Sequence, residues 1–453
     1  MRKATILGSV KTYFLGRLWL WGLPLLLGIS ACGRESLREF FGGYTPRERY
    51  EHALLQAGLD RTALGSDWIA AAAAALDNAI TVEAPYREES YLDPKEAMAT
   101  AYRVSLQRGQ RIEATFESEP DSSYQVFIDL FLISRRPDAV PRYLTSADSL
   151  ERKLDHLARR DGDYLIRIQP ELLRGGRYSI SIVVQPSLVF PVSGHDTRAI
   201  GGRYGDPRDG GRRRHEGLDI FAPRGTPVLA AADGVVRSTR RNNLGGNVVW
   251  LRDKFGRTHY YAHLDRQAVS RGQRVQAGDT IGFVGNTGNA RTTPHHLHFG
   301  VYSRGSFDPY PALQPLPTTP ADFAGDRGVI GSLVRVTRAS ARTRALPSTD
   351  SSVLAELPLH TPLQVEAGTG AWYRVTTPDG TIGFVGTSLT EPADTPIRRE
   401  VVAGGATLLT GPASTAVALD RIAPGAEIPV LGTYGEFLFV QGPNGKVGWL
   451  ALD

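Results

Sequence analysis

The sequence predicts a mainly β protein that is built from several domains. At 453 residues, the chain has room for about three domains. The segments 124–131 and 178–183 are rich in β-branched and aromatic residues and are bounded by turn residues, as strands are. Near the C-terminus, one pattern recurs at a constant offset of 65 residues. These observations predict a β-sandwich and, near the C-terminus, small β-barrels.

The first 31 residues are expected to be a lipoprotein signal peptide. A positively charged stretch precedes an apolar run at 18–31. This run is short of the roughly 20 apolar residues that a membrane span needs. It ends in Ile29-Ser30-Ala31-Cys32, which resembles the lipobox of bacterial lipoproteins. The resemblance implies that Cys32 is lipidated and anchors the protein to a membrane, which we expect to be the outer membrane on its periplasmic side. An ordinary secretory signal with an incidental cysteine is the alternative.

The charge balance and the cysteine count narrow the possible partners and metal sites. The net charge is +5, but four basic and no acidic residues precede residue 32, so the remainder has 48 basic and 47 acidic residues. We therefore infer no nucleic-acid partner from charge. Cys32 is the only cysteine, which excludes an internal disulfide and a zinc site of thiolates. A metal would have to be held by His, Asp or Glu.

Two segments are expected to precede the region that carries chemistry. Residues 36–95 are expected to be helical, because Thr45-Pro46-Arg47-Glu48 has the form of a capped helix start and residues 70–75 are rich in alanine. Residues 96–186 are expected to form a β-sandwich accessory domain. The chemistry is expected in residues 187–312. A proline-rich stretch follows at 313–332 and predicts a semi-rigid linker between separate cores.

Six of the ten histidines lie between His215 and His298. His215 and Asp219 are four residues apart and share a face if this segment is extended, because strand side chains alternate. His296 and His298 share a face in the same way, and the apolar residues around them indicate a core strand. Two buried imidazoles are costly without partners, which a metal ion would supply.

Zinc suits this set of donors. It prefers imidazole and carboxylate ligands, and a catalytic zinc site keeps about three protein ligands and one open position. His215, Asp219 and one of His296 or His298 would meet that count. The remaining histidine of the pair would then be free for proton transfer, and His263 is a further candidate for that role.

The region contains the motifs His215-x-Gly217-x-Asp219, Tyr261-Ala262-His263-Leu264 and His296-Leu297-His298, with supporting segments at 222–228, 232–236 and 285–289. These motifs resemble the signatures of lysostaphin-type zinc endopeptidases, which are bacterial cell-wall hydrolases. The resemblance covers about residues 190–303 and implies a β-rich peptidase domain. It implies Zn²⁺ as the cofactor, His215, Asp219 and His298 as its ligands, and His263 and His296 as the residues that move protons.

Two other histidines need an interpretation. His259 has the same parity as His263 and could take its place, but the Tyr-Ala-His-Leu motif favours His263. His295 stands where the family often has proline. We expect it to be a loop residue, because alternation turns it away from His296 and His298.

The C-terminal repeat predicts two small β-barrels, at 333–390 and 398–453. The offset aligns 372–375 with 437–440 and 378–385 with 443–450, and each copy has a tight turn at Asp-Gly or Asn-Gly. Both copies resemble bacterial SH3-like domains, which are common at the ends of cell-wall hydrolases. The resemblance leaves a wall-binding role and a role as cover or spacer open.

Together these resemblances imply a zinc metalloendopeptidase that hydrolyses peptide bonds in peptidoglycan cross-links or stem peptides during cell-wall remodelling. We expect peptidoglycan and a membrane as partners, and a monomer. Two alternatives stay open. One is a non-catalytic activator of wall amidases, as in relatives that have lost ligands. The other is an exported protease that acts on foreign proteins.

Overall fold

The computed structural model describes residues 43–119, 124–136, 139–339 and 341–451, and it is mainly β. The expected signal peptide at 1–31 and the lipidation site Cys32 lie outside the described residues. In the described ranges, no helix has the length and apolar character to span a membrane. The chain divides into two units, residues 1–57 and 58–453.

The first unit contributes helix α2 (Pro46–Gln56) among its described residues. Its start has the capping box that the sequence predicts. The Thr45 hydroxyl accepts a hydrogen bond from the Glu48 backbone N–H at 3.1 Å, and the Glu48 carboxylate accepts one from the Thr45 N–H at 2.9 Å. Both donors would otherwise lack a partner at the helix end, so these bonds fix where α2 begins.

The second unit begins with a 3₁₀ turn, helix α3 and a β-sandwich. The expectation of helix up to residue 95 is wrong beyond Asp77, where α3 ends, because residues 86–92 form a strand in which every second residue is buried. The helical elements are η1 (Leu59–Arg61) and α3 (Ala63–Asp77). One sheet is ordered β1 (Ile80–Thr81), β3 (Thr100–Leu106), β8 (Gly162–Pro170), β5 (Val126–Leu132) and β6 (Arg142–Ser146). The facing strands are ordered β2 (Tyr86–Leu92), β9 (Gly176–Pro186), β4 (Gln110–Glu119) and β7 (Lys153–Leu157).

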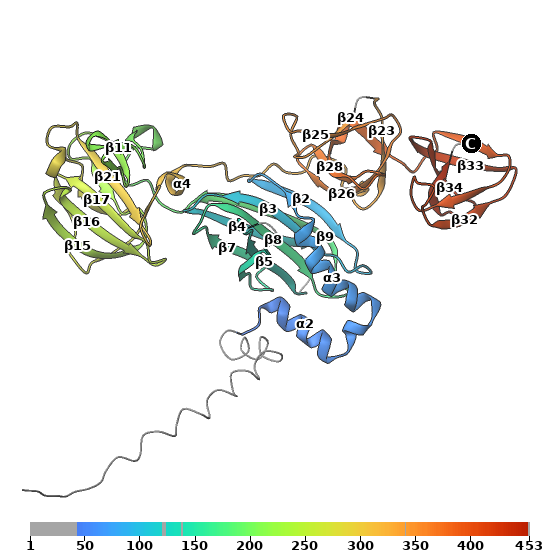
Figure 1. The fold of residues 1–453 in the computed structure, drawn as a ribbon, viewed down its shortest axis with the longest axis horizontal. Helices are drawn as coiled ribbons and strands as arrows, with labels where there is room; N and C mark the ends of the chain where they lie inside the picture. Colours follow the sequence, from blue (N-terminus) through green and yellow to red (C-terminus); the bar gives the residue numbers. More distant parts are fainter. Residues whose placement is uncertain (1–42, 120–123, 137–138, 340, 452–453) are drawn as a thin grey trace, which may run out of the picture. The chain divides into compact units, whose positions relative to one another are not determined.

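The sandwich core follows from alternation along these strands. In β4 the apolar residues Ile112, Ala114 and Phe116 are buried at every second position and contact the inward side chains of the other sheet. Helix α3 packs on the first sheet at β3 and β8 (Figure 1). Trp68 of α3 is 1% exposed, and its indole N–H donates to the Pro170 carbonyl at 2.8 Å.

Residues 187–312 fold around an eight-stranded sheet and a three-stranded sheet (Figure 1). The apolar face of the large sheet encloses one core, which includes Leu218, Leu297 and Phe299. Its path runs through β10 (Ile200–Gly202), β13 (Leu218–Phe221), β21 (His296–Tyr302), β17 (Thr258–Leu264), β16 (Gly246–Asp253), β15 (Gly234–Asn242) and β19 (Arg274–Val275), and β22 (Ser306–Phe307) pairs with β21. The small sheet is β14 (Pro227–Leu229), β20 (Thr280–Phe283) and β18 (Arg266–Gln267). The remaining elements are the hairpin of β11 (Pro207–Arg208) and β12 (Arg213–Arg214), the turns η2 (Thr197–Ala199), η3 (Asp209–Gly211) and η4 (Gly288–Ala290), and helix α4 (Tyr310–Leu313).

The C-terminal repeat appears as two sheets of matching strand order. Corresponding strands start 65 residues apart, as at Leu333 and Arg398 or at Trp372 and Phe437. The first copy is ordered β23 (Leu333–Val336), β26 (Pro362–Thr369), β27 (Trp372–Thr376), β28 (Ile382–Gly386), β24 (Ala341–Arg344) and β25 (Val353–Leu357), with η6 (Thr387–Leu389) and β29 (Thr390–Pro392) after β28. The second is ordered β30 (Arg398–Val402), β33 (Ala426–Tyr434), β34 (Phe437–Gln441), β35 (Val447–Ala451), β31 (Ala406–Leu409) and β32 (Ala418–Ile422).

The proline-rich stretch 313–332 does not separate two independent cores. Leu316 packs against the sandwich core. Phe323 and, in the turn η5 (Arg327–Val329), Val329 belong to the core of the first repeat copy. Strand β2 of the sandwich also pairs with β26 of that copy, so the two form one continuous sheet. Proline content predicted a spacer, but the apolar residues between the prolines give this segment its packing partners.

Candidate metal centre and active-site cleft

The three central strands of the large sheet bring the predicted site residues together. Strand β13 pairs with β21 so that Asp219 lies opposite His298, and β17 pairs with β21 so that Ala262 lies opposite His298 as well. Leu218 and Leu297 point into the core. Because side chains alternate, Asp219 and His298 therefore share the outer face.

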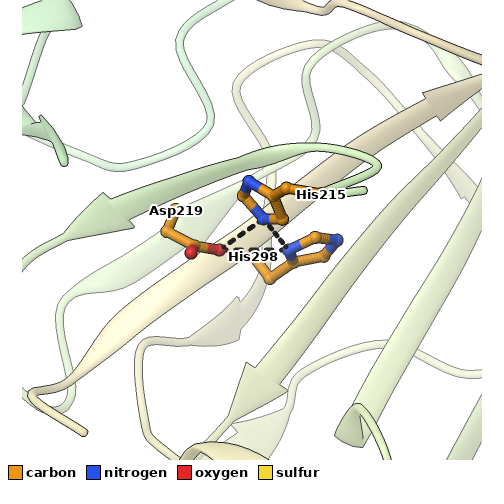
Figure 2. A group of neighbouring side chains, drawn as sticks. All are labelled: His215, Asp219 and His298. Atoms are coloured by element: carbon orange, nitrogen blue, oxygen red, sulfur yellow. Dashed lines mark hydrogen bonds and ion pairs between the residues drawn. The ribbon is translucent and has the colours of Figure 1, made fainter. Parts of the chain in front are cut away.

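His215 reaches the same point from the loop between β12 and β13. Its Nδ1 donates to the Arg203 carbonyl at 2.7 Å, which leaves Nε2 as the free acceptor on the side of Asp219 and His298. Nε2 lies 3.0 Å from Asp219 Oδ1 and 2.9 Å from His298 Nδ1, and the latter two atoms are 3.1 Å apart (Figure 2).

The geometry of these three atoms fits one zinc ion. Ligands that are bound to tetrahedral zinc at about 2.0–2.1 Å lie about 3.3 Å from one another, close to the three separations here. The three side chains form a possible metal-binding group among the described residues. Gly217 allows this approach. A Cβ at that position would lie 2.5 Å from the Phe299 carbonyl oxygen and 3.0 Å from ring atoms of His298.

The protonation states also suit a metal centre. Burial disfavours the Asp219 carboxylate, but the neighbouring His215 and His298 rings outweigh this effect and hold the pKa of Asp219 well below its usual range. Burial lowers the pKa of His298, although Asp219 partly offsets it. The site therefore presents an ionised carboxylate and a neutral imidazole, which are the forms that bind metal.

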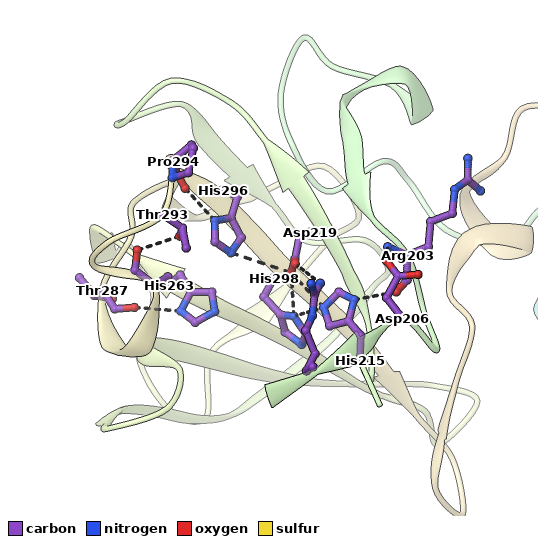
Figure 3. A network of polar contacts seen from close by, with 12 residues as sticks. Arg203, Asp206, His215, Asp219, His263, Thr287, Thr293, Pro294, His296 and His298 are labelled. Atoms are coloured by element: carbon purple, nitrogen blue, oxygen red, sulfur yellow. Dashed lines mark hydrogen bonds and ion pairs between the residues drawn. The ribbon is translucent and has the colours of Figure 1, made fainter. Parts of the chain in front are cut away.

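His263 and His296 flank this group on one side (Figure 3). Their ring centroids are 5.0 Å apart, and the His263 ring is 6.0 Å from that of His298. His263 Nδ1 donates to the Thr287 carbonyl and His296 Nδ1 to the Pro294 carbonyl, each at 2.8 Å. Because a carbonyl can only accept, the second nitrogen of each neutral ring carries a lone pair. Burial lowers the pKa of His263 to about 4, helped by the nearby His296 and His298.

His263 enters the cleft because the backbone departs from regular alternation. By parity with Tyr261 and His259, it would point into the core. Its φ of 60° is left-handed, and the β16–β17 register shifts at this point, so the ring is turned to the outer face. A left-handed residue other than glycine is uncommon and is often found at functional sites.

The two other histidines lie outside this group. His259 is fully buried, and its Nε2–H donates to the Asp253 carboxylate at 3.1 Å. This position favours His263 over His259 as the residue available for chemistry. His295 precedes β21 and does not line the cleft, in agreement with its expected place in a loop.

The group lies in an open cleft of about 360 Å³. Its described lining comes from residues 208–298, so neither the sandwich nor the repeat copies contribute a wall to it. The sequence reasoning did not single out Arg208, Phe221 or Tyr260, which also line it. Strand alternation could have identified Phe221, which is two residues from Asp219, and Tyr260, which is two residues from Ala262. It could not have identified Arg208, which lies in a short hairpin outside these strands.

Two regions of the chain match known protein families. Residues 213–309 match peptidase family M23, and residues 340–391 match the bacterial SH3 domain. The chain is 43% identical over 124 residues to an L-Ala–D-Glu endopeptidase of Bacillus subtilis, covering 24% of this chain and 38% of the relative. It is 44% identical over 99 residues to the peptidoglycan DD-endopeptidase ShyC of Vibrio cholerae, covering 22% of each. The solved catalytic domain of lysostaphin from Staphylococcus simulans is 36% identical, with a TM-score of 0.23, over 25% of this chain and 90% of that one.

These matches define the class of the central domain. The chain contains a peptidase domain of family M23, followed by a bacterial SH3 domain. It spans between about a fifth and two fifths of the length of these curated relatives. The likeness to them is therefore confined to the domain that holds the His-Asp-His group.

Proposed function

We propose that this protein is a zinc metalloendopeptidase that hydrolyses peptide bonds in peptidoglycan cross-links or stem peptides. The observation that carries the proposal is the complete group of His215, Asp219 and His298 in an open cleft beside two further histidines. Both curated relatives named above are endopeptidases, and one is named for peptidoglycan. We therefore assign the substrate to the peptide part of the bacterial cell wall.

In this proposal, His215 Nε2, Asp219 Oδ1 and His298 Nδ1 are the zinc ligands. When bound, zinc supplies a Lewis acid that polarises the scissile carbonyl and makes water more acidic. The carbonyl of Arg203 keeps His215 in the tautomer that offers Nε2. Three protein ligands leave one position open, which a hydrolytic site requires.

His263 and His296 are proposed to move protons. His263 is neutral near pH 7 and has a lone pair on Nε2, so it can accept a proton from the attacking water. His296 Nε2 is 3.9 Å from Asp219 Oδ1, so the ring borders the proposed ligands and lines the same cleft. His296 would then stabilise the oxyanion and supply a proton to the leaving amine.

We further propose that the protein acts in the cell envelope as a lipid-anchored monomer. The lipobox-like Ile29-Ser30-Ala31-Cys32 supports the anchor. The common strand order of the two repeat copies supports a second SH3-like domain at 398–453. A Cys32→Ser variant tests the anchor. It should leave the membrane fraction, and unchanged mass and fractionation would contradict lipidation.

The alternatives make different predictions. A non-catalytic activator would not need a full ligand set with two flanking histidines, which this site has. An exported protease would cut foreign proteins in preference to wall. The deciding experiment is to incubate the protein with purified sacculi and identify the released fragments by mass spectrometry. Fragments with new peptide ends are expected. Intact sacculi alongside cleaved protein substrates would instead indicate the exported protease.

A further inference from the structure

The Asp219 carboxylate uses its two oxygens for two different partners. Oδ1 faces His215 and His298, and Oδ2 accepts a hydrogen bond from Arg208 Nη2 at 2.6 Å. The ion pair is largely shielded, with the Asp219 side chain 15% and the Arg208 side chain 32% exposed. The guanidinium therefore holds the oxygen that points away from the two histidines.

We propose that Arg208 is a positioning residue of the metal centre, which fixes the rotation of Asp219 so that Oδ1 alone is offered to the metal. This inference rests on the proposed zinc site. A charge-assisted bond of this length is strong and directional. Partners that orient a metal ligand are typically worth about 10–100-fold in metal affinity.

Two backbone segments flank the Arg208–Asp219 ion pair. Arg208 lies in the β11–β12 hairpin, where it pairs with Arg213. On the other side, Gly202 of β10 lies in register with Asp219. A Cβ at position 202 would be 2.7 Å from Asp219 Oδ2 and 2.8 Å from Arg208 Nη2. Only glycine at position 202 leaves room for the Arg208–Asp219 ion pair. The β11–β12 hairpin and β10 therefore both accommodate this contact.

The test is zinc affinity, measured by competition with a chromogenic chelator. Arg208→Met should weaken zinc binding about 10–100-fold, and Arg208→Lys should recover part of the loss. Gly202→Ala should weaken it independently by displacing the same pair. Arg213→Gln is the matched control, because Arg213 lies in the same hairpin, pairs with Asp209 and contacts no proposed ligand. Its zinc affinity should not change.

A purely structural role would lower the melting temperature of Arg208→Met without changing zinc affinity, and this result would overturn the proposal. A wild-type protein that binds no zinc would contradict the metal centre itself. A wild type that binds zinc but cleaves no wall would contradict only the proposed substrate. The three failures are thus distinguishable.

A second, independent feature is a basic hollow of about 800 Å³ in the β-sandwich. None of its six arginines forms an ion pair with an acidic side chain in the described part of the chain. The two lining aspartates accept hydrogen bonds from the Arg108 backbone N–H and the Ser105 hydroxyl. The arginines are Arg108, Arg135, Arg136, Arg142, Arg159 and Arg160.

We infer that this hollow binds phosphate groups of an anionic ligand. Six arginines against two aspartates leave the lining with four uncompensated positive charges. These like charges give the hollow a positive potential that attracts an anion. All six cations are arginines, whose planar forks match phosphate oxygens. Pyrophosphate and phosphate monoesters carry more negative charge per group than carboxylate, so a few such groups would neutralise the hollow.

Pyrophosphate and vesicles of phosphatidylglycerol serve as probes for a soluble phosphate and a lipid headgroup. Arg159→Gln/Arg160→Gln should weaken binding of at least one probe about tenfold or more. Arg111→Gln is the control, because it removes one positive charge from the same domain but from an arginine already paired with Asp155. Binding to pyrophosphate alone would identify a soluble ligand, and binding to vesicles alone a membrane. No binding to either, or equal loss in the control, would overturn the inference.

Discussion

Arg374 of the first repeat copy and Glu88 of the sandwich form a bidentate ion pair that is buried from solvent. Arg374 Nη2 is 2.9 Å from Glu88 Oε1, and Nε is 3.0 Å from Oε2. Tyr86 and Tyr102 also donate to this carboxylate, at 2.6 and 2.7 Å. The pair lies beside the junction where β2 and β26 join two sheets into one. The SH3 domain and the sandwich are therefore one packing unit.

The first prediction is that Arg374→Met destabilises the sandwich by about 3–5 kcal/mol, because it leaves a buried charge without its partner. A chain that ends at residue 320 should be destabilised for the same reason. The measurement is urea unfolding. Glu88→Gln/Arg374→Met should recover much of the loss because neither charge remains. An unchanged unfolding midpoint in the truncated chain would instead support independent cores.

The second prediction separates the histidines by role. His298→Ala should lose zinc and activity together. His263→Ala and His296→Ala should keep nearly one zinc per chain but lose about 10²–10⁴-fold in turnover, the usual worth of general acid–base groups. Elemental analysis and hydrolysis of a soluble wall peptide should be measured on each variant. Zinc loss in His296→Ala with retention in His298→Ala would reverse the assignment.

The third prediction concerns the close approach at Gly217. In Gly217→Ala, the new methyl group would overlap the Phe299 carbonyl and the His298 ring. The ring should shift, and zinc affinity should fall at least tenfold, the size expected when a ligand's orientation is lost. Gly404→Ala is the control, since nothing lies within 4 Å of a Cβ there. Equal zinc affinity in the two variants would show that the ring adapts.

Strand alternation predicted much of the site, because it depends only on local geometry. It places His296 and His298 on one face of β21, and the pairing of β13 with β21 brings Asp219 to the same face. Alternation could not place His263, because its left-handed backbone conformation turns the side chain to the opposite face. No neighbouring residue in the sequence predicts that conformation. Alternation also gave no reason to single out Arg208, whose contact with Asp219 depends on how a short hairpin folds back.

The sequence predicted the C-terminal repeat but not the join between the sandwich and the first repeat copy. The 65-residue repeat is a property of the sequence itself, and the strands follow it closely. The join between β2 and β26 depends on which sheet edges meet, and neither edge is marked by composition. Glu88 is buried at this join and needs a partner from elsewhere in the chain, but its burial could not be predicted from a segment that was expected to be helical.

The last prediction concerns a buried network at the turn between β16 and β17, where Asp253 contacts Arg257 and His259. Burial disfavours the Asp253 carboxylate, but hydrogen bonds from His259 and Arg257 outweigh it and lower the pKa of Asp253 from 3.8 to about 2. A lowered carboxyl pKa stabilises the fold above the unfolded value, near 3.8, and this stability is lost as pH falls towards 2. It amounts to about 2 kcal/mol. Asp253→Asn should therefore be less stable than wild type at pH 6, and the gap should narrow between pH 4 and pH 2 in urea unfolding. A gap that stays constant over this range would show that Asp253 titrates at its ordinary pKa in the folded protein.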